Sequence, residues 1–179
     1  MKLLAISGSP RAASSNAALL RAAASVAPAG TDVTFYDDRV AALPMFSPDL
    51  DGEGAVPPPA VAELRALLRA ADGVVISTPE YAHGVPGALK NALDWIVSSG
   101  ELEGKPVVLL AASPSGGQWA QASLTPTLEV MGARLVVNLA VTFTRGQIDG
   151  TGALLDRELA ETLRTSLAAL AEVMAPAGG

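Results

Sequence analysis

The fold is decided by two similar stretches of sequence, Leu3-Leu4-Ala5-Ile6-Ser7-Gly8-Ser9-Pro10-Arg11 and Gly73-Val74-Val75-Ile76-Ser77-Thr78-Pro79-Glu80-Tyr81. Each is a short apolar run that ends in a polar loop, and a helical pattern follows each loop. Short runs rich in Val, Ile and Leu are typical of strands that are buried on both faces of a sheet. Each stretch is therefore predicted to be a strand followed by a loop that leads into a helix.

The rest of the chain repeats this alternation. Apolar runs predict five strands, and the helical stripes between them predict five helices. Right-handed crossovers then favour an α/β fold of three layers, in which a five-stranded parallel sheet has the flavodoxin-like order 2-1-3-4-5 and helices cover both faces. We expect residues 1–179 to form one domain, with residues 43–60 as a surface loop. The predicted strands are 3–7, 33–36, 73–77, 106–111 and 134–141, and the predicted helices are 14 or 15 to 27, 60–71, 86–98, 119–131 and 155–174.

Composition limits the possible functions. The chain has 179 residues, of which 50% are hydrophobic and 17% charged, as in a globular protein. A net charge of −6 disfavours nucleic acid and anionic lipid as partners. Cysteine is absent and His83 is the only histidine, so disulfides, thiol chemistry and a His/Cys metal site are not expected. No apolar run approaches the roughly 20 residues of a membrane span, and no signal-peptide pattern is present, so we expect a cytoplasmic protein.

The first loop has the chemistry of an anion site. In an open parallel sheet, loops after the strands gather at the carboxyl edge, where ligands bind. A phosphate needs fixed donors and a positive field, which the start of a helix provides. Hydroxyl, amide and guanidinium groups add further donors. An alternative interpretation is a polar turn with an N-capping serine. The candidate phosphate-binding residues are Ser9, Arg11, Ser14, Ser15 and Asn16.

The second and third loops suit a flat ring. Pro79 and Pro86 restrict the backbone on either side of Tyr81, whose ring could form a wall of a pocket. The third loop, Ala112–Trp119, contains small residues that allow close approach to a planar ligand. Taken alone, these segments could also be a proline at a helix start and a flexible turn. Together with a phosphate site, the three loops predict flavin mononucleotide (FMN).

At this point the residues resemble a known family. The motifs Gly8-Ser9-x-Arg11-x-x-Ser14-x-Asn16, Pro79-Glu80-Tyr81 and Pro86-Gly87-x-Leu89-Lys90-Asn91-Ala92-x-Asp94-Trp95 are similar to those of NADPH-dependent FMN reductases, a flavodoxin-like group of soluble quinone, chromate and azo-dye reductases. The resemblance implies that the first loop holds the FMN phosphate, and that the chain forms a homodimer or homotetramer. It also implies an isoalloxazine pocket made by Pro79, Glu80, Tyr81 and Ala82 on one side and by Ser113, Ser115, Gly116 and Gly117 on the other.

The predicted function is an FMN-dependent NAD(P)H oxidoreductase with ping-pong kinetics. A hydride would pass from NADPH or NADH to flavin N5, and electrons would then pass to a small acceptor such as a quinone or free flavin. Because the flavin carries the redox step, no side chain is predicted to be catalytic. The alternatives are an electron-carrier flavodoxin without its own nicotinamide reaction, and a fold relative that no longer binds flavin.

Four further residues have roles that the sequence leaves open. His83 is either a solvated loop residue or a group that contacts substrate. Leu93 and Trp95 either face a partner subunit or pack in the core. The family commonly has asparagine where this chain has Ala82, so a side-chain hydrogen bond there would be lost while a backbone contact to the flavin would survive.

Overall fold

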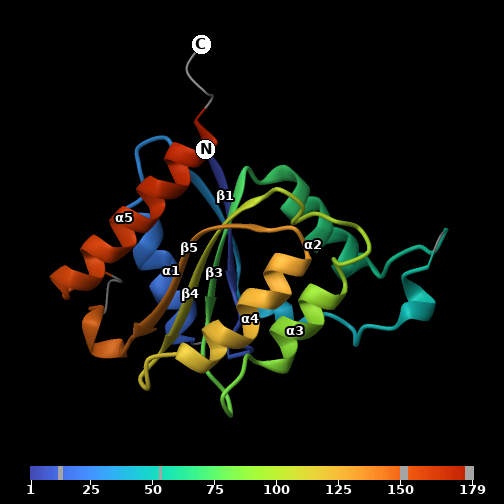
Figure 1. Ribbon diagram of the computed structural model, residues 1–179, viewed down its shortest axis with the longest axis horizontal. Helices are drawn as coiled ribbons and strands as arrows, with labels where there is room; N and C mark the ends of the chain where they lie inside the picture. The colour runs from blue at the N-terminus through green and yellow to red at the C-terminus, as the bar shows by residue number, and fades with distance from the viewer. Residues whose placement is uncertain (12–13, 53, 150–152, 176–179) are drawn as a thin grey trace.

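The computed structural model is a three-layer α/β sandwich, and it describes residues 1–11, 14–52, 54–149 and 153–175 (Figure 1). Five parallel strands form one sheet in the order β2-β1-β3-β4-β5. The strands are β1 (Lys2–Ser7), β2 (Asp32–Tyr36), β3 (Gly73–Thr78), β4 (Pro106–Ser113) and β5 (Arg134–Thr142). The predicted fold class and strand order are confirmed.

Helices cover both faces of the sheet (Figure 1). One face packs against α1 (Ser15–Ser25) and α5 (Arg157–Met174). The other packs against α2 (Pro59–Ala70), α3 (Gly87–Asp94) and α4 (Gln118–Val130). Short 3₁₀ turns occur at η1 (Asp38–Ala42), η2 (Pro48–Leu50) and η3 (Arg145–Gln147). The predicted helices are all present, although the third is shorter than expected.

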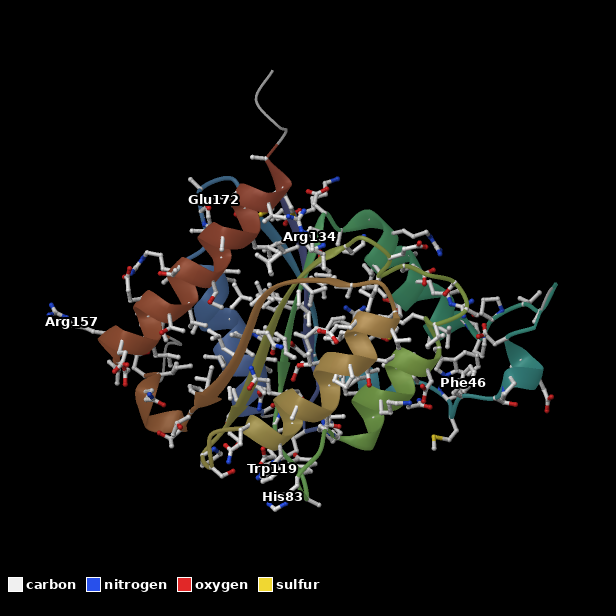
Figure 2. All side chains as sticks on the ribbon, in the orientation of Figure 1. Phe46, His83, Trp119, Arg134, Arg157 and Glu172 are labelled. Atoms are coloured by element: carbon white, nitrogen blue, oxygen red, sulfur yellow. The ribbon has the colours of Figure 1, made fainter. Side chains whose placement is uncertain are left out.

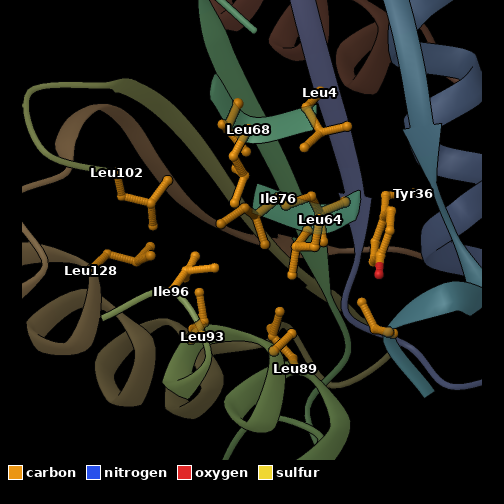
Figure 3. Close-up of a cluster of buried hydrophobic side chains, with 14 of the residues drawn as sticks. Leu4, Tyr36, Leu64, Leu68, Ile76, Leu89, Leu93, Ile96, Leu102 and Leu128 are labelled. Atoms are coloured by element: carbon orange, nitrogen blue, oxygen red, sulfur yellow. The ribbon is translucent and has the colours of Figure 1, made fainter. Parts of the chain in front are cut away.

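Two hydrophobic clusters hold the layers together. Successive side chains of a strand point to opposite faces of the sheet. In β1, Leu4 and Ile6 therefore join the cluster under α2, α3 and α4, whereas Leu3 and Ala5 join the cluster under α1 and α5. Figure 3 shows part of the first cluster, including Leu4 of β1 and Ile76 of β3. Since β1, β3 and β4 are buried on both sides, the sheet is a rigid support for the loops at its carboxyl edge.

Two details of the predicted helical stripes are wrong. The last helix begins at Arg157 because Asp156 caps it, so Leu155 lies before the helix and is 62% exposed. The α-helix after β3 ends at Asp94, and the chain continues in turns that leave Val97 59% exposed. Leu93 and Trp95 are both buried, which favours core packing over contact with a partner.

The described residues between η1 and α2 form a long loop that contains η2, close to the predicted 43–60 although α2 already begins at Pro59. Asn91 of α3 and Trp95, which follows α3, anchor the beginning of this loop. The Trp95 Nε1–H donates to the Pro44 carbonyl at 2.8 Å, and the Trp95 and Phe46 rings pack edge to face. The Asn91 side chain donates to the same carbonyl at 2.9 Å and accepts from the Phe46 N–H at 2.7 Å. The asparagine and tryptophan of the Pro86–Trp95 motif therefore have a structural role at this loop.

Among the described residues, no helix combines the length and apolar character needed to cross a membrane. Histidine, aspartate and glutamate side chains in the same part of the chain nowhere form a group of three able to hold a metal ion.

Candidate FMN-binding cleft

A cleft of about 260 Å³ lies at the carboxyl edge of the sheet, where the loops after β1, β3, β4 and β5 meet. It brings together most of the predicted site residues, namely Ser9, Arg11, Ser14, Ser15, Asn16, Pro79, Glu80, Tyr81 and Ser113. Ala112, Pro114, Phe143 and Thr144 complete its walls. Ala82, Ser115, Gly116 and Gly117 do not line it.

Two larger hollows, of about 430 and 450 Å³, lie between β5 and α5. Their linings contain acidic side chains, Asp156 and Glu158 in one and Glu158 and Glu161 in the other. Acidic groups repel a phosphate at close range. Among the residues lining the carboxyl-edge cleft, by contrast, Glu80 is the only acid and Arg11 supplies a cation. The smaller cleft is therefore the better candidate for an anionic ligand.

Ser14 forms the start of α1. Its Oγ accepts hydrogen bonds from the N–H groups of Asn16 at 3.1 Å and Ala17 at 3.4 Å. The N-capping interpretation is thus correct for Ser14, but it does not exclude ligand binding, because a hydroxyl that accepts two bonds still has its own proton to donate. The next residue, Ser15, is the first of the helix, and its N–H and hydroxyl have no partner among the described residues.

Arg11 and Ser9 stand at the same end of the cleft. The Arg11 guanidinium forms no ion pair with any described residue, so its charge is available to a ligand. Ser9 is buried, and its Oγ accepts the Arg11 N–H at 3.4 Å, which leaves the hydroxyl proton free. Gly8 is required for packing: a Cβ there would come within 2.8 Å of both the Leu89 and Thr78 side chains.

Asn16 lies in the cleft wall but is used for internal bonding. Its Nδ2 donates to the Ala112 carbonyl at 3.3 Å, and its Oδ1 accepts from the Ser77 hydroxyl at 2.7 Å. The side chain thus joins α1 to the ends of β3 and β4. The second N–H of the amide is the only donor left on this side chain, so Asn16 is chiefly a residue that positions the first loop.

The second loop turns tightly between Tyr81 and Gly84. The N–H of each donates to the carbonyl of the other, at 2.9 and 3.0 Å. Ala82 and His83, at the tip, have φ angles of +49° and +60°, which is the left-handed region that side chains disfavour. The turn carries Ala82 away from the cleft lining, while Tyr81, 43% exposed, stays within it.

Glu80 joins the second loop to the third. Its Oε2 accepts from the N–H groups of Trp119 at 2.8 Å and Ala120 at 3.2 Å. These are early N–H groups of α4, whose N-cap is Gly117 and therefore has no side chain to accept them. The Glu80 carboxylate thus replaces the missing cap, and it faces α4 as well as the cleft.

The third loop contributes less to the lining than predicted. Ser113 lines the cleft, but the Ser115 hydroxyl is bonded to that of Ser113 at 2.8 Å and lies outside the lining. Gly116 and Gly117 have φ angles of +102° and +77°. A Cβ on Gly117 would lie 2.1 Å from the Ala111 carbonyl oxygen, so this glycine is needed for the approach of α4 to β4.

Sequence reasoning missed Phe143 and Thr144, which form the wall next to Ser113. The Phe143 N–H donates to the Ser113 carbonyl at 2.9 Å, which fixes this wall to the end of β4. Both residues directly follow β5. The rule that ligands bind after the carboxyl ends of parallel strands could have identified them, had it been applied to the fifth strand as well.

The sheet order and the carboxyl-edge cleft define a flavodoxin-like protein, and comparison with known proteins identifies the family. A sequence model described as NADPH-dependent FMN reductase matches residues 1–147. A NAD(P)H-dependent FMN reductase of Pseudomonas aeruginosa is 35% identical over 176 residues, which cover 95% of this chain and 93% of the relative. A quinone reductase of Escherichia coli is 34% identical over 181 residues, covering 96% and 94%.

Solved structures agree with these sequence relatives. The NAD(P)H:(acceptor) oxidoreductase FerB, a flavoenzyme of Paracoccus denitrificans, superimposes with a TM-score of 0.82 at 25% identity and covers 97% of this chain and 96% of its own. The chain belongs to the NADPH-dependent FMN reductase family. It is an oxidoreductase that uses FMN and a nicotinamide donor, so the predicted family, enzyme class and cofactors are confirmed.

Proposed function

We propose that the carboxyl-edge cleft binds FMN with its phosphate at the first loop and its isoalloxazine between the loops after β3 and β4. One observation carries this proposal: residues predicted from three separate loops converge on one cleft. The residues that would hold the phosphate are Ser9, Arg11, Ser14 and Ser15, with Asn16 positioning them. Pro79, Tyr81 and Ser113 would contact the ring, together with Pro114 and Phe143.

The donor set fits a phosphate. The first loop offers the Ser9, Ser14 and Ser15 hydroxyls, together with the Arg11 guanidinium and the Ser15 N–H, neither of which has a partner in the part of the chain that the structure describes. These are the groups that bind phosphate at helix starts. The carboxylate of Glu80, the only acid in the lining, accepts two hydrogen bonds from the start of α4, where the helix dipole favours a negative charge. Prolines and aromatic rings at the other end offer apolar surface to a flat ligand.

We infer that the reaction alternates two half-reactions in this one cleft. Bound FMN supplies hydride acceptance from NAD(P)H and electron transfer to a second substrate. The protein contributes binding and orientation: the first loop fixes the anionic end, and the Glu80 bonds to α4 fix the distance between the two loops around the ring. The acceptor we favour is a quinone, because the Escherichia coli relative is named a quinone reductase and a Burkholderia relative a 2-hydroxy-1,4-benzoquinone reductase.

The phosphate assignment is tested by comparing FMN with riboflavin, which lacks the phosphate. Arg11→Ala should weaken FMN binding by about 10- to 100-fold, the usual effect of losing a hydrogen bond to a charged group. Riboflavin affinity should change little. The matched control is Arg164→Ala, which removes an exposed arginine on α5. Fluorescence titration measures each affinity, and an equal loss for both ligands would contradict the assignment of Arg11 to the phosphate.

The nicotinamide half-reaction has a direct test. When NADPH or NADH is mixed anaerobically with the FMN-loaded protein in a stopped-flow instrument, the absorbance of the oxidised flavin should fall rapidly after mixing. The donor that bleaches faster is the preferred one. A protein that binds FMN but is not bleached by either donor would be an electron carrier.

We further propose that residues 1–179 act as one domain and that the protein is a homodimer or homotetramer of the cytoplasm, where NAD(P)H is available. Leu93 and Trp95 are buried and cannot supply the subunit contact. The loop between η1 and α2 offers exposed apolar side chains instead, including Met45 at 80% and Val56 at 88% exposed, and it projects from the body of the molecule (Figure 1). Sedimentation analysis measures the assembly.

A further inference from the structure

Two exposed aromatic residues occur in the loop after β3 and at the start of α4. The chain has only 2 Trp, 2 Tyr and 3 Phe residues. Of the large hydrophobic residues that are exposed, Tyr81 and Trp119 are the aromatic ones, at 43% and 50%. Tyr81 lines the cleft. Trp119 does not, but its backbone N–H donates to the carboxylate of Glu80, which is a lining residue. Grouped exposed apolar surface commonly marks a site that binds another molecule.

His83 extends this aromatic surface. Its imidazole stacks on the Trp119 ring with centroids 5.0 Å apart and an angle of 27° between the planes. Figure 2 shows the two side chains together at the end of the sheet where the cleft lies. The stack joins the loop after β3 to the beginning of α4, and Trp119 remains 50% exposed in its presence. We call these two side chains the His83–Trp119 wall.

The backbone places the wall at a cost in conformational energy. Ala82 and His83 are the two described non-glycine residues with positive φ, and they follow one another at the turn that carries the imidazole to the indole. Strain of this kind collects at functional sites, where the surrounding structure maintains it. On the opposite side, the Glu80 bonds to the Trp119 and Ala120 N–H groups fix the start of α4. The backbone is therefore anchored on both sides of the wall, and the two side chains contact each other by stacking.

We propose that the His83–Trp119 wall contacts the electron acceptor and selects flat aromatic acceptors, such as bicyclic quinones, over compact inorganic ones. The inference rests on the proposed function, since it places the acceptor beside the ring end of the same cleft. A planar ring gains stacking energy against an indole, whereas a small hydrated anion gains none. Neither ring of the wall takes part in electron transfer. The wall determines specificity through binding alone.

The kinetic test compares menadione with ferricyanide as acceptors for the FMN-loaded protein. Trp119→Ala should raise the KM for menadione about tenfold, the loss expected when one stacked aromatic contact is removed. The KM for ferricyanide and the rate of flavin bleaching by NAD(P)H should not change. Trp119→Phe should keep most of the menadione affinity, and His83→Ala should lose less than Trp119→Ala. The matched control is Val130→Ala, an exposed apolar residue at the other end of α4.

A binding measurement provides a second readout that does not depend on turnover. Trp95 is fully buried, so added menadione should quench the emission of Trp119 selectively, and Trp119→Phe should abolish that quenching. The proposal is overturned if Trp119→Ala raises the KM of both acceptors equally. It is also overturned if that variant changes the oligomeric state, because the wall would then be a subunit contact. Failure of the proposed function would appear differently, as wild-type flavin that NAD(P)H does not bleach.

Discussion

At the scale of single residues, Ala82 shows that a departure from a family pattern can strain the backbone. The position has a φ of +49°, and asparagine is the side chain that tolerates this region best after glycine. An asparagine, which the resemblance leads us to expect at this position, would suit this backbone conformation better than alanine does. Alanine has no such compensation, so the turn between Tyr81 and Gly84 is strained in this chain.

The strain at Ala82 leads to a stability prediction. Ala82→Asn should raise the free energy of unfolding by about 0.5–1 kcal/mol, part of the roughly 1–2 kcal/mol that a left-handed residue costs. Ala82→Val should lower it, because a β-branched side chain fits this region worse. Urea denaturation monitored by circular dichroism measures both. If the two variants shift the midpoint in the same direction, the φ assigned to Ala82 is wrong.

Single residues also show what sequence cannot reveal. The sequence predicts a serine cap at residue 14 or 15, and Ser14 is found to cap α1, because capping depends on local chemistry. The bonds of Asn16 depend instead on Ser77 and Ala112, which are 61 and 96 residues away. No pattern within the first loop contains that information. The sequence can therefore predict correctly that a polar residue lies in a binding site, and yet not reveal that its side chain is hydrogen-bonded to other protein groups.

At the scale of elements, α4 begins without a cap of its own. Its N-cap is Gly117, and the acceptor for its early N–H groups comes from Glu80, in the loop after β3. A carboxylate at a helix start gains from the hydrogen bonds and from the helix dipole. A neighbouring loop thus supplies the cap of α4, and the stability of this helix depends on the position of Glu80 in the cleft.

Replacing Glu80 should therefore weaken α4. Glu80→Ala should lower the free energy of unfolding by about 1–2 kcal/mol, the usual cost of losing a cap. Glu80→Gln should lower it less, because the amide oxygen still accepts although its charge is gone. Glu129→Ala, at the exposed far end of α4, is the control and should change little. Thermal unfolding followed by far-ultraviolet circular dichroism measures all three, and equal effects at positions 80 and 129 would exclude a capping role.

The start of α5 gives a dependence on pH. Hydrogen bonds from the Leu159 N–H and the Gln147 side chain to Asp156 lower the pKa of its carboxyl group below the ordinary 3.8. A lowered native pKa means that the unfolded state binds the proton more readily. This contribution to stability is therefore complete above the ordinary pKa and is lost as pH falls through the native one. In acid denaturation, Asp156→Asn should unfold with a shallower dependence on pH below about pH 5. A slope identical to the wild type would contradict the assignment.

The elements themselves were predictable because their causes are local. Buried parallel strands require continuous apolar runs, so each predicted strand lies within two residues of its observed bounds. The errors occur where a boundary is set by tertiary contact. Asp156 caps α5 after Leu155, and the turns after Asp94 follow the anchoring of Trp95 to Pro44. A prediction from periodicity alone extends the helix through such points, because periodicity contains no information about tertiary contacts.

At the scale of the whole molecule, the cleft depends on sheet order. β1 lies beside β3, and β3 beside β4, so the loops after all three strands come together although they are far apart in sequence. The sequence predicted this convergence from topology, without any contact between the loops. The ties between the loops, Glu80 to α4 and His83 to Trp119, required the structure. They explain how loops from separate strands present one surface.

A ligand that bridges these loops should stabilise the whole protein. At a free FMN concentration about 100 times its Kd, binding to the native state alone adds about 2.7 kcal/mol, which for a chain of this size raises Tm by roughly 5–10 °C. Calorimetry with and without added FMN measures the shift. The Arg11→Ala variant should need a higher FMN concentration for the same rise in Tm, because the rise depends on the affinity for FMN and this variant is expected to bind the phosphate more weakly. Hydrogen exchange should slow in the loops after β1, β3 and β4 together. Protection confined to a single loop, with no change in Tm, would mean that FMN does not bridge the cleft.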